Sequence, residues 1–223
     1  MCRLSLLLLS GLGLALGTSV EGPRDRVRQD HDHCTAIAVD RAATIDGGCV
    51  SGTSADGSPI DFRMVYVPPK TYGAGEKRAV YKQVDDYPRI VDASRAPSYA
   101  PVSPDQKPSV PIGYIDMPEG TTYGYWDAAY GVMNEAGLSM GESSCSGRLA
   151  AEPREDKSDT SKALLWIGEL SDIAMERCAT ARCAIETMGG LAEKYGFYGT
   201  TSVVEAGEAL TIADKSEAWV FHI

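Results

Sequence analysis

Cys34 combines a reactive residue type with an unusual place in the chain. It begins a short apolar stretch directly after a polar segment, residues 20–33, in which arginines and acidic residues alternate. If proteolysis removes that segment, one residue carries both a thiol and a free α-amine. The α-amine has a pKa of about 7.7 to 8.0, so it can accept the thiol proton and return it to a leaving amine. Cys34 is therefore a candidate nucleophile with the chain terminus as its base.

Other interpretations of Cys34 have to be weighed against this one. On its position alone it also fits a small buried strand residue or half of a disulfide. The chain has three histidines, and two of them, His31 and His33, precede Cys34, so a terminal base explains how a cysteine hydrolase manages with so few. His and Cys are good zinc ligands, but a leader this polar offers no rigid surroundings for a metal. We therefore expect no metal and no other cofactor.

The first residues have the pattern of a secretory signal. The apolar run from Leu4 to Leu16 follows Arg3 and is too short to span a bilayer, but it fits the core of a signal peptide. We predict a signal peptide at 1–19, a propeptide at 20–33 and one domain at 34–223, with a signal anchor as the alternative. This places the protein in the secretory pathway, extracellular or lysosomal, with no membrane association once the signal is removed.

Net charge and cysteine content indicate which binding partners and which disulfides to expect. The net charge is −10, and removal of residues 1–33 leaves it unchanged because four basic and four acidic residues are lost together. Nucleic acid is therefore not an expected partner, since phosphate binding depends on Lys and Arg. Five cysteines follow the signal segment, an odd number, and the sequence does not reveal their pairing. Cys178 and Cys183 lie about 140° apart around a predicted helix, so we expect them to be poorly placed to bond each other.

Alternation and turn signals predict the elements that position these residues. A hairpin is expected at the start of the domain, with strands at 35–39 and 49–52 around the turn Asp46-Gly47-Gly48. A long, irregular excursion over the surface is expected at 70–120, where prolines recur. Further strands are predicted at 62–67, 129–133, 138–141, 201–205, 209–213 and 218–223. Ser161 is the predicted N-cap of a helix at 162–178, and a second helix is expected to run from 179 or 180 to 195 and to end at Gly196. The order of elements indicates an α+β fold.

Six segments resemble the dipeptidase A and secernin family. They are Cys34-Thr35-Ala36-Ile37-Ala38-Val39, the stretch from Asp61 to Pro68, Tyr123-Gly124-Tyr125 with Tyr130-Gly131-Val132-Met133-Asn134-Glu135, the stretch from Gly141 to Ser146, the stretch from Glu176 to Arg182, and Glu217-Ala218-Trp219-Val220-Phe221. They occur in order from Cys34 to the end of the chain, so together they are more specific than any one motif. The resemblance implies an N-terminal-nucleophile (Ntn) hydrolase, a four-layer αββα sandwich with antiparallel sheets. It also implies that Cys34 is the nucleophile.

The resemblance carries other roles less securely. Asn134 is the only asparagine in the sequence. The resemblance places it near the oxyanion site of related acylases, where a side-chain amide would stabilise the tetrahedral intermediate. Asn134 equally fits a left-handed turn residue. Asp56 is a candidate to hold the α-amine of Cys34 or of a substrate. However, Gly52 stands where a basic residue is expected, and Asp56 is displaced by one position, so a plain turn residue is the alternative. Thr53 and Glu142 are the predicted substrate-binding residues, although strand alternation also allows Glu142 to face solvent.

The predicted function is a cysteine-type dipeptidase acting on short peptide substrates. The alternatives are an acylase that cleaves a non-peptide amide and a catalytically silent, secernin-like interaction protein. The sequence does not determine the oligomeric state. The motif from Glu217 to Phe221 is followed by only two residues, so we also expect the fold to be incomplete at the C-terminus.

Overall fold

The computed structural model describes residues 34–55, 61, 63–82, 84, 87–199 and 207–223. The predictions for the signal peptide, the propeptide, Asp56 and the strand at 201–205 fall outside these residues. The strands are β1 (Cys34–Val39), β2 (Val50–Ala55), β3 (Val65–Val67), β4 (Thr71–Tyr72), β5 (Lys77–Val80), β6 (Gly113–Asp116), β7 (Gly120–Thr121), β8 (Tyr125–Asp127), β9 (Gly131–Asn134), β10 (Ser139–Cys145), β11 (Gly207–Ala213) and β12 (Ala218–His222). The helices are α1 (Ile167–Arg177) and α2 (Ala181–Tyr195), with short 3₁₀ turns at Arg41–Ala43 and Pro97–Tyr99.

The predicted hairpin at the start of the domain is confirmed. Strands β1 and β2 pair antiparallel, with Cys34 opposite Ala55 and Val39 opposite Val50. The connection turns through Gly47, whose φ of 72° lies in the left-handed region that favours glycine. Cys34 is therefore the first residue of a regular strand.

A six-stranded antiparallel sheet forms the centre of the molecule. Its strand order is β12-β11-β10-β9-β8-β3, and the longest ladder joins β10 to β11. Strands β9, β11 and β12 lie close to their predicted positions, whereas β8 was not predicted. The tight connection between β9 and β10 was predicted, and it uses Gly137 with a φ of 88°.

The two helices pack on one face of this sheet. Their apolar side chains form a core with β10 and β11, in which Leu170, Ile173, Met188, Leu210 and Ile212 are completely buried. The second helix matches its prediction, and Gly196 ends it with a φ of 78°. The Thr180 hydroxyl, which was not predicted as a cap, accepts from the Cys183 backbone N–H. None of the described helices is long and apolar enough to cross a lipid bilayer.

The prediction that Ser161 begins the first helix is wrong. The helix starts at Ile167, and the preceding residues are extended because they pair with segments that are distant in sequence. Ala163 pairs with Pro153, and Leu165 pairs with Phe197. These bridges satisfy backbone groups that a helix at 162–166 would otherwise have bonded internally.

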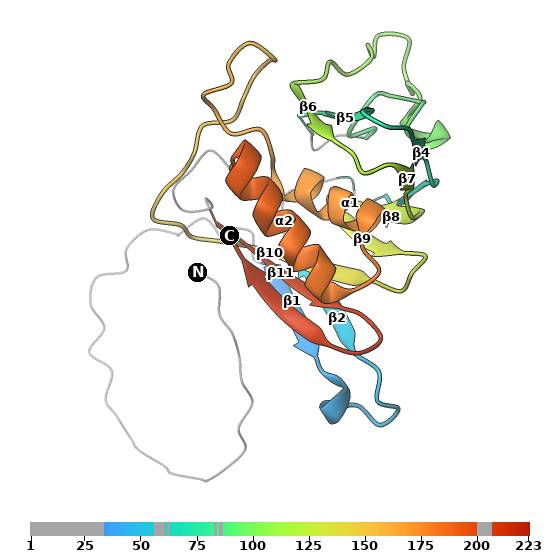
Figure 1. Ribbon diagram of the computed structural model, residues 1–223, viewed down its shortest axis with the longest axis vertical. Helices are drawn as coiled ribbons and strands as arrows, with labels where there is room; N and C mark the ends of the chain where they lie inside the picture. The colour runs from blue at the N-terminus through green and yellow to red at the C-terminus, as the bar shows by residue number, and fades with distance from the viewer. Residues whose placement is uncertain (1–33, 56–60, 62, 83, 85–86, 200–206) are drawn as a thin grey trace, which may run out of the picture.

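The excursion between β3 and β8 is more ordered than predicted. It forms two small sheets, β4 with β7 and β5 with β6, which lie together as a lobe beyond α1 and β8 (Figure 1). Val80, Ile90, Tyr99 and Ile115 from this lobe are completely buried, so the excursion contributes to the core and does not simply run over the surface.

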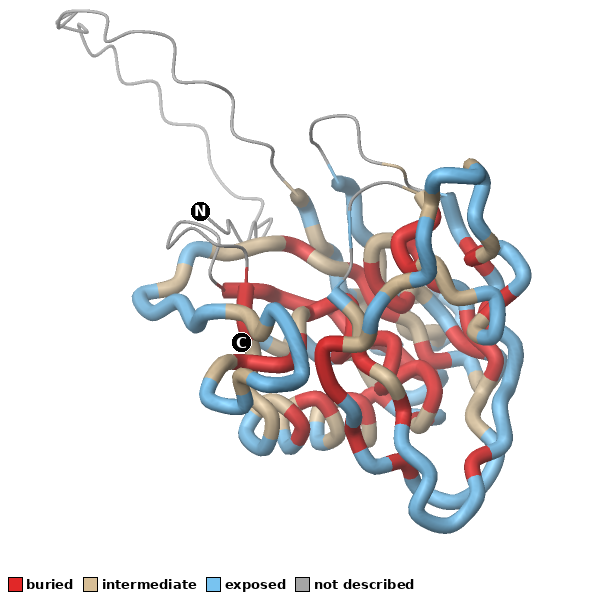
Figure 2. Tube along the Cα trace, turned by 90° about the horizontal axis from the view of Figure 1, so that it is seen from above, coloured by how far each residue is buried: buried red, intermediate tan, exposed pale blue. Residues whose placement is uncertain are grey.

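The β1–β2 hairpin lies on the face of the six-stranded sheet opposite the helices (Figure 1). The buried residues concentrate between helices and sheet, while the hairpin and the loops are largely exposed (Figure 2). The described residues thus form a helical layer, a sheet and a second, two-stranded sheet. This is an α+β fold, and the four-layer αββα sandwich stays a prediction.

Candidate active site around Cys34

Cys34 lies at the junction of the hairpin with the central sheet. Its backbone carbonyl accepts a hydrogen bond from the Ser143 hydroxyl of β10 at 3.4 Å. The Cys34 residue is partly exposed and its thiol is not part of a disulfide. The candidate nucleophile is therefore held by a neighbouring strand and is accessible to solvent.

The hairpin approaches β10 so closely that only small residues fit between them. A Cβ at Gly141 would lie 2.7 Å from the Gly52 carbonyl oxygen. The Ser51 hydroxyl donates to the Ser139 hydroxyl at 2.8 Å. Contacts this short leave no room for large apolar side chains, so polar contacts determine where the hairpin sits.

Thr53, a predicted substrate-binding residue, reaches β10 at Glu142. Its hydroxyl donates to the Glu142 backbone carbonyl at 2.6 Å. Thr53 is also the register partner of Ala36 in β1. The structure therefore brings Cys34, Thr53 and the backbone of Glu142 together, although the three are far apart in sequence.

The side chain of Glu142 has a different environment from its backbone. Successive strand residues point to opposite faces, so this side chain lies on the face away from Ser143. It accepts from the Ser144 hydroxyl at 3.3 Å and lies near Glu208, which is 2% exposed. Burial raises the pKa of Glu142. Any contact of this side chain with a substrate stays a prediction.

Tyr130 is a member of this group that the sequence analysis did not single out. It is 7% exposed and lies near Thr53 and the Glu142 backbone. Burial raises the pKa of Tyr130, and a charged Cys34 thiolate raises it further. Tyr130 begins one of the motifs that carried the family resemblance, which was the only signal in the sequence that pointed to it.

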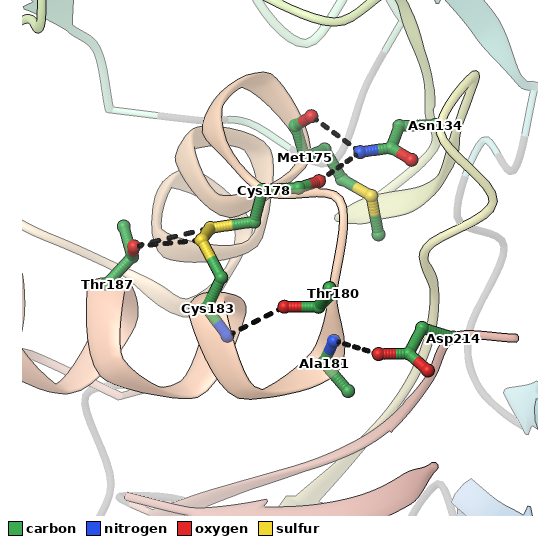
Figure 3. The surroundings of a disulfide bond; sticks show 8 residues. All are labelled: Asn134, Met175, Cys178, Thr180, Ala181, Cys183, Thr187 and Asp214. Carbon is green, nitrogen blue, oxygen red and sulfur yellow. Dashed lines mark hydrogen bonds between the residues drawn. A yellow bond between two sulfur atoms is a disulfide. The ribbon is translucent and has the colours of Figure 1, made fainter. Parts of the chain in front are cut away.

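Asn134 lies at the opposite end of β10, in the turn from β9. Its amide nitrogen donates to the carbonyls of Met175 at 2.9 Å and Cys178 at 2.7 Å (Figure 3). Its amide oxygen accepts from the backbone N–H groups of Ala136 and Leu138, both at 3.1 Å. Both amide hydrogens are thus engaged at the end of α1, away from Cys34. The left-handed turn interpretation is wrong, because no described residue except glycine has a positive φ. These contacts indicate that Asn134 joins the β9–β10 turn to α1.

Cys178 and Cys183 form a disulfide, contrary to the prediction (Figure 3). The predicted angle of 140° assumed helical geometry between the two cysteines, but α1 ends at Arg177 and Cys178 is extended, with φ −116° and ψ 138°. The change of chain direction before α2 brings the two Cα atoms to 5.5 Å. The disulfide thus joins the end of α1 to the first turn of α2, next to the carbonyl that Asn134 binds.

We expect the double substitution Cys178→Ala with Cys183→Ala to lower the free energy of unfolding by about 2 kcal/mol, because a disulfide closing a loop this short removes a modest amount of chain entropy from the unfolded state. Chemical denaturation monitored by circular dichroism measures this loss. Cys49→Ala is the control and should not change the midpoint. A reducing agent should destabilise the parent and leave the double variant unaffected; equal effects on both proteins would contradict the prediction.

Neither the surface hollow of the excursion nor the other described acidic and cysteine side chains form a comparable site. A surface hollow of about 430 Å³ lies in the excursion, but Asp92, the one acidic residue of its lining, already accepts hydrogen bonds from Tyr81 and Ser94. Within the described part of the chain, no group of three or more His, Cys, Asp or Glu residues is arranged to hold a metal ion. Among the described residues, those around Cys34 are therefore the best candidates for a catalytic site.

One family model matches most of the chain. Residues 33–223 match the model of peptidase family C69, so the match covers most of the chain and starts one residue before Cys34. It includes all the strands and helices described above. The chain therefore belongs to peptidase family C69.

Proposed function

We propose that this protein is a cysteine-type dipeptidase whose nucleophile is the thiol of an N-terminal Cys34. The observation that carries the proposal is the place of Cys34: it is the first residue of β1, packed against β10, at the start of the region that matches a peptidase family. No other partly exposed cysteine of the described residues begins a strand. Short peptides are the proposed substrates.

The chemistry follows from the thiol and the α-amine of one residue. The α-amine takes the thiol proton, and the sulfur forms a bond to the carbonyl carbon of the scissile amide. When the C–N bond breaks, the proton passes to the leaving amine, and the acyl group remains on sulfur as a thioester. Water then attacks the thioester carbonyl with the α-amine as base, which releases the acid and restores the thiol.

We also propose that the protein resides in the secretory pathway, extracellular or lysosomal. The Cys178–Cys183 disulfide supports this location, since disulfides form and persist mainly in oxidising compartments. The signal-like run of residues 4–16 supports it independently.

We predict that the active protein begins at Cys34, because a thiol within the chain lacks the α-amine that serves as base. Intact-mass analysis combined with N-terminal sequencing of the active fraction checks this directly. A protein processed one residue earlier, which keeps His33, is the matched control: it retains the Cys34 thiol and should be inactive. An active species that still carries residues 20–33 would refute the proposed base.

A substrate panel distinguishes the dipeptidase from the related acylase. The panel pairs dipeptides with acyl amides of similar size, tested on the processed protein. Higher kcat/KM for dipeptides supports the proposal, whereas higher kcat/KM for acyl amides would favour the acylase.

A further inference from the structure

Two buried carboxyl groups share one arginine where the excursion meets α1 and β8. The Nη2 atom of Arg95 bonds to Oδ2 of Asp172 in α1, and it lies 3.8 Å from Oδ2 of Asp127 in β8. Both aspartates are completely buried. Because the two oxygens depend on the same nitrogen, the aspartates lie close enough for their negative charges to repel each other in the protein interior.

Each of these aspartates also has one oxygen without a donor. Oδ2 of Asp127 accepts from the Tyr99 hydroxyl, and Oδ2 of Asp172 accepts from Arg95. The Oδ1 atoms of both are buried and have no hydrogen-bond partner in the described part of the chain. An ionised carboxylate in this position bears the cost of removing a charge from water, and protonation removes that charge. The geometry therefore favours a proton on one of the two groups.

The charges around the pair are unbalanced in the same direction. The acids of this contact come from α1 and β8, and its arginines come from the excursion. The acids are Glu169, Asp172, Glu176 and Asp127, and the arginines are Arg78, Arg89 and Arg95. Asp92, which also lies near Arg95, is partly exposed and accepts hydrogen bonds from Tyr81 and Ser94. Burial raises the pKa of the neighbouring tyrosines Tyr72, Tyr99 and Tyr125, so they stay neutral. Negative charge is thus in excess by at least one.

We propose that Asp127 and Asp172 form a buried proton-binding site that holds one proton between them and keeps the excursion attached to α1 while the proton is bound. Loss of this proton leaves two carboxylates beside the single guanidinium of Arg95, and their repulsion loosens the contact. The attachment therefore weakens as the pH rises. The inference goes beyond the proposed peptidase activity and does not depend on it.

The direction of the pH effect follows from burial. Burial raises the pKa of Asp127, and burial together with the charge of Asp127 raises the pKa of Asp172 well above its usual range. An unfolded aspartate titrates near pH 3.9, so the folded protein keeps a proton that the unfolded chain has lost. The stability that the site contributes is complete below that value and is lost as the pH rises through the raised pKa, which belongs to the pair.

The test is urea unfolding of the processed protein at intervals between about pH 5 and pH 9. A difference of one bound proton makes the unfolding equilibrium constant rise about tenfold per pH unit. We expect the parent to show this rise within the range, and Asp127→Asn and Asp172→Asn each to reduce it by up to about tenfold per pH unit, because each replaces one carboxyl group with a neutral amide. Equal slopes for the parent and both variants would overturn the proposal.

Asp214→Asn is the matched control, because Asp214 is a third buried aspartate, 6% exposed. Burial alone would raise its pKa, but hydrogen bonds from the backbone N–H groups of Ala181, Ser216 and Glu217 outweigh burial and lower it. Its titration is therefore complete below this pH range. The control should keep the slope of the parent even if it loses stability, and a slope reduced as in the other two variants would contradict the proposal.

Two further measurements test the proton and its effect directly. Infrared spectroscopy of the folded parent at neutral pH should show the C=O stretch of a protonated carboxyl group, and both Asn variants should lose it. Absence of this band, or its persistence in both variants, would overturn the proposal. Hydrogen exchange, corrected for the intrinsic effect of pH, should show β5 and β6 losing protection with rising pH before β11 does. Equal loss in all three strands would show that the proton does not hold the excursion in particular.

Discussion

Replacement of Cys34 by alanine is expected to lower dipeptide turnover by more than about a thousandfold while the protein stays folded. The substitution removes the only thiol that the proposed mechanism uses, and loss of a nucleophile leaves only the residual effects of binding and electrostatics. Cys34 lies at the edge of the fold and contributes little packing, so the unfolding transition should stay close to that of the parent. Steady-state hydrolysis of dipeptides measures the loss.

The experiment needs a control for processing, because the substitution can also prevent removal of residues 20–33. Both proteins should therefore be produced with residue 34 exposed by an inserted protease site. Cys49→Ala is the matched variant: Cys49 is also a partly exposed thiol outside any disulfide, and it lies at the other end of the hairpin. Cys145→Ala should likewise not abolish turnover. Activity of the Cys34→Ala protein within tenfold of the parent would show that Cys34 is not the nucleophile.

Substitution of Arg78 by methionine is expected to lower the free energy of unfolding by about 3–5 kcal/mol. Arg78 comes from β5 in the excursion and inserts between two acidic residues of α1. Its Nε lies 2.9 Å from Glu176, and a terminal nitrogen bonds to Glu169. The exposed fractions are 5% for Arg78, 1% for Glu169 and 7% for Glu176. Removal of the arginine leaves two carboxylates buried without their main counter-charge, which costs much more than loss of a surface ion pair.

Chemical denaturation checks this prediction, and two variants sharpen it. Lys82→Met is the control, because the Lys82–Glu155 pair is solvent-exposed and its loss should not move the midpoint. Glu169→Gln together with Glu176→Gln in the Arg78→Met background should recover much of the lost stability, since it removes the uncompensated charges. A stability of the Arg78→Met protein within 1 kcal/mol of the parent would show that the pair does not hold the excursion on α1.

A second arginine of the excursion also pairs with buried acidic residues of α1 and β8. Arg95 bonds to Asp172 of α1 and lies 3.8 Å from Asp127 of β8, while the Tyr99 hydroxyl bonds to Asp127. Burial raises the pKa of both Asp127 and Asp172. Together with Arg78, these contacts attach the excursion to α1 through buried charges, in addition to the apolar side chains that it contributes to the core. Both help to explain how a proline-rich segment with short strands becomes an ordered part of the domain.

Much of the local structure was predictable from the sequence, because its signals act over a few residues. The Gly47 turn, the Gly196 stop and the positions of β11 and β12 depend on neighbouring residues, and the structure confirms them. The α+β class follows from the order of these elements. The family was also predictable, because its motifs occur in order along the chain.

Features that depend on partners distant in sequence were predicted wrongly or missed. Ser161 carries a valid N-cap signal, but pairing of Leu165 with Phe197 keeps the chain extended up to Trp166. Cys178 and Cys183 were expected to be poorly placed to bond because helical geometry was assumed between them, and the break at Cys178 removes that assumption. In both cases long-range contacts outweighed a local preference that is worth only a fraction of a kcal/mol per residue.

The candidate site also has features that the sequence predicts and features that only the tertiary structure determines. The residue type of Cys34, the polar segment before it and the scarcity of histidine are properties of the sequence, and they were enough to identify a candidate nucleophile and its base. The surroundings of Cys34 depend on how the hairpin packs on β10, which brings Thr53 within 2.6 Å of a carbonyl 89 residues away and places Tyr130 beside both. Only tertiary packing sets such contacts, because each strand tolerates several partners and the burial of the whole sheet selects one of them.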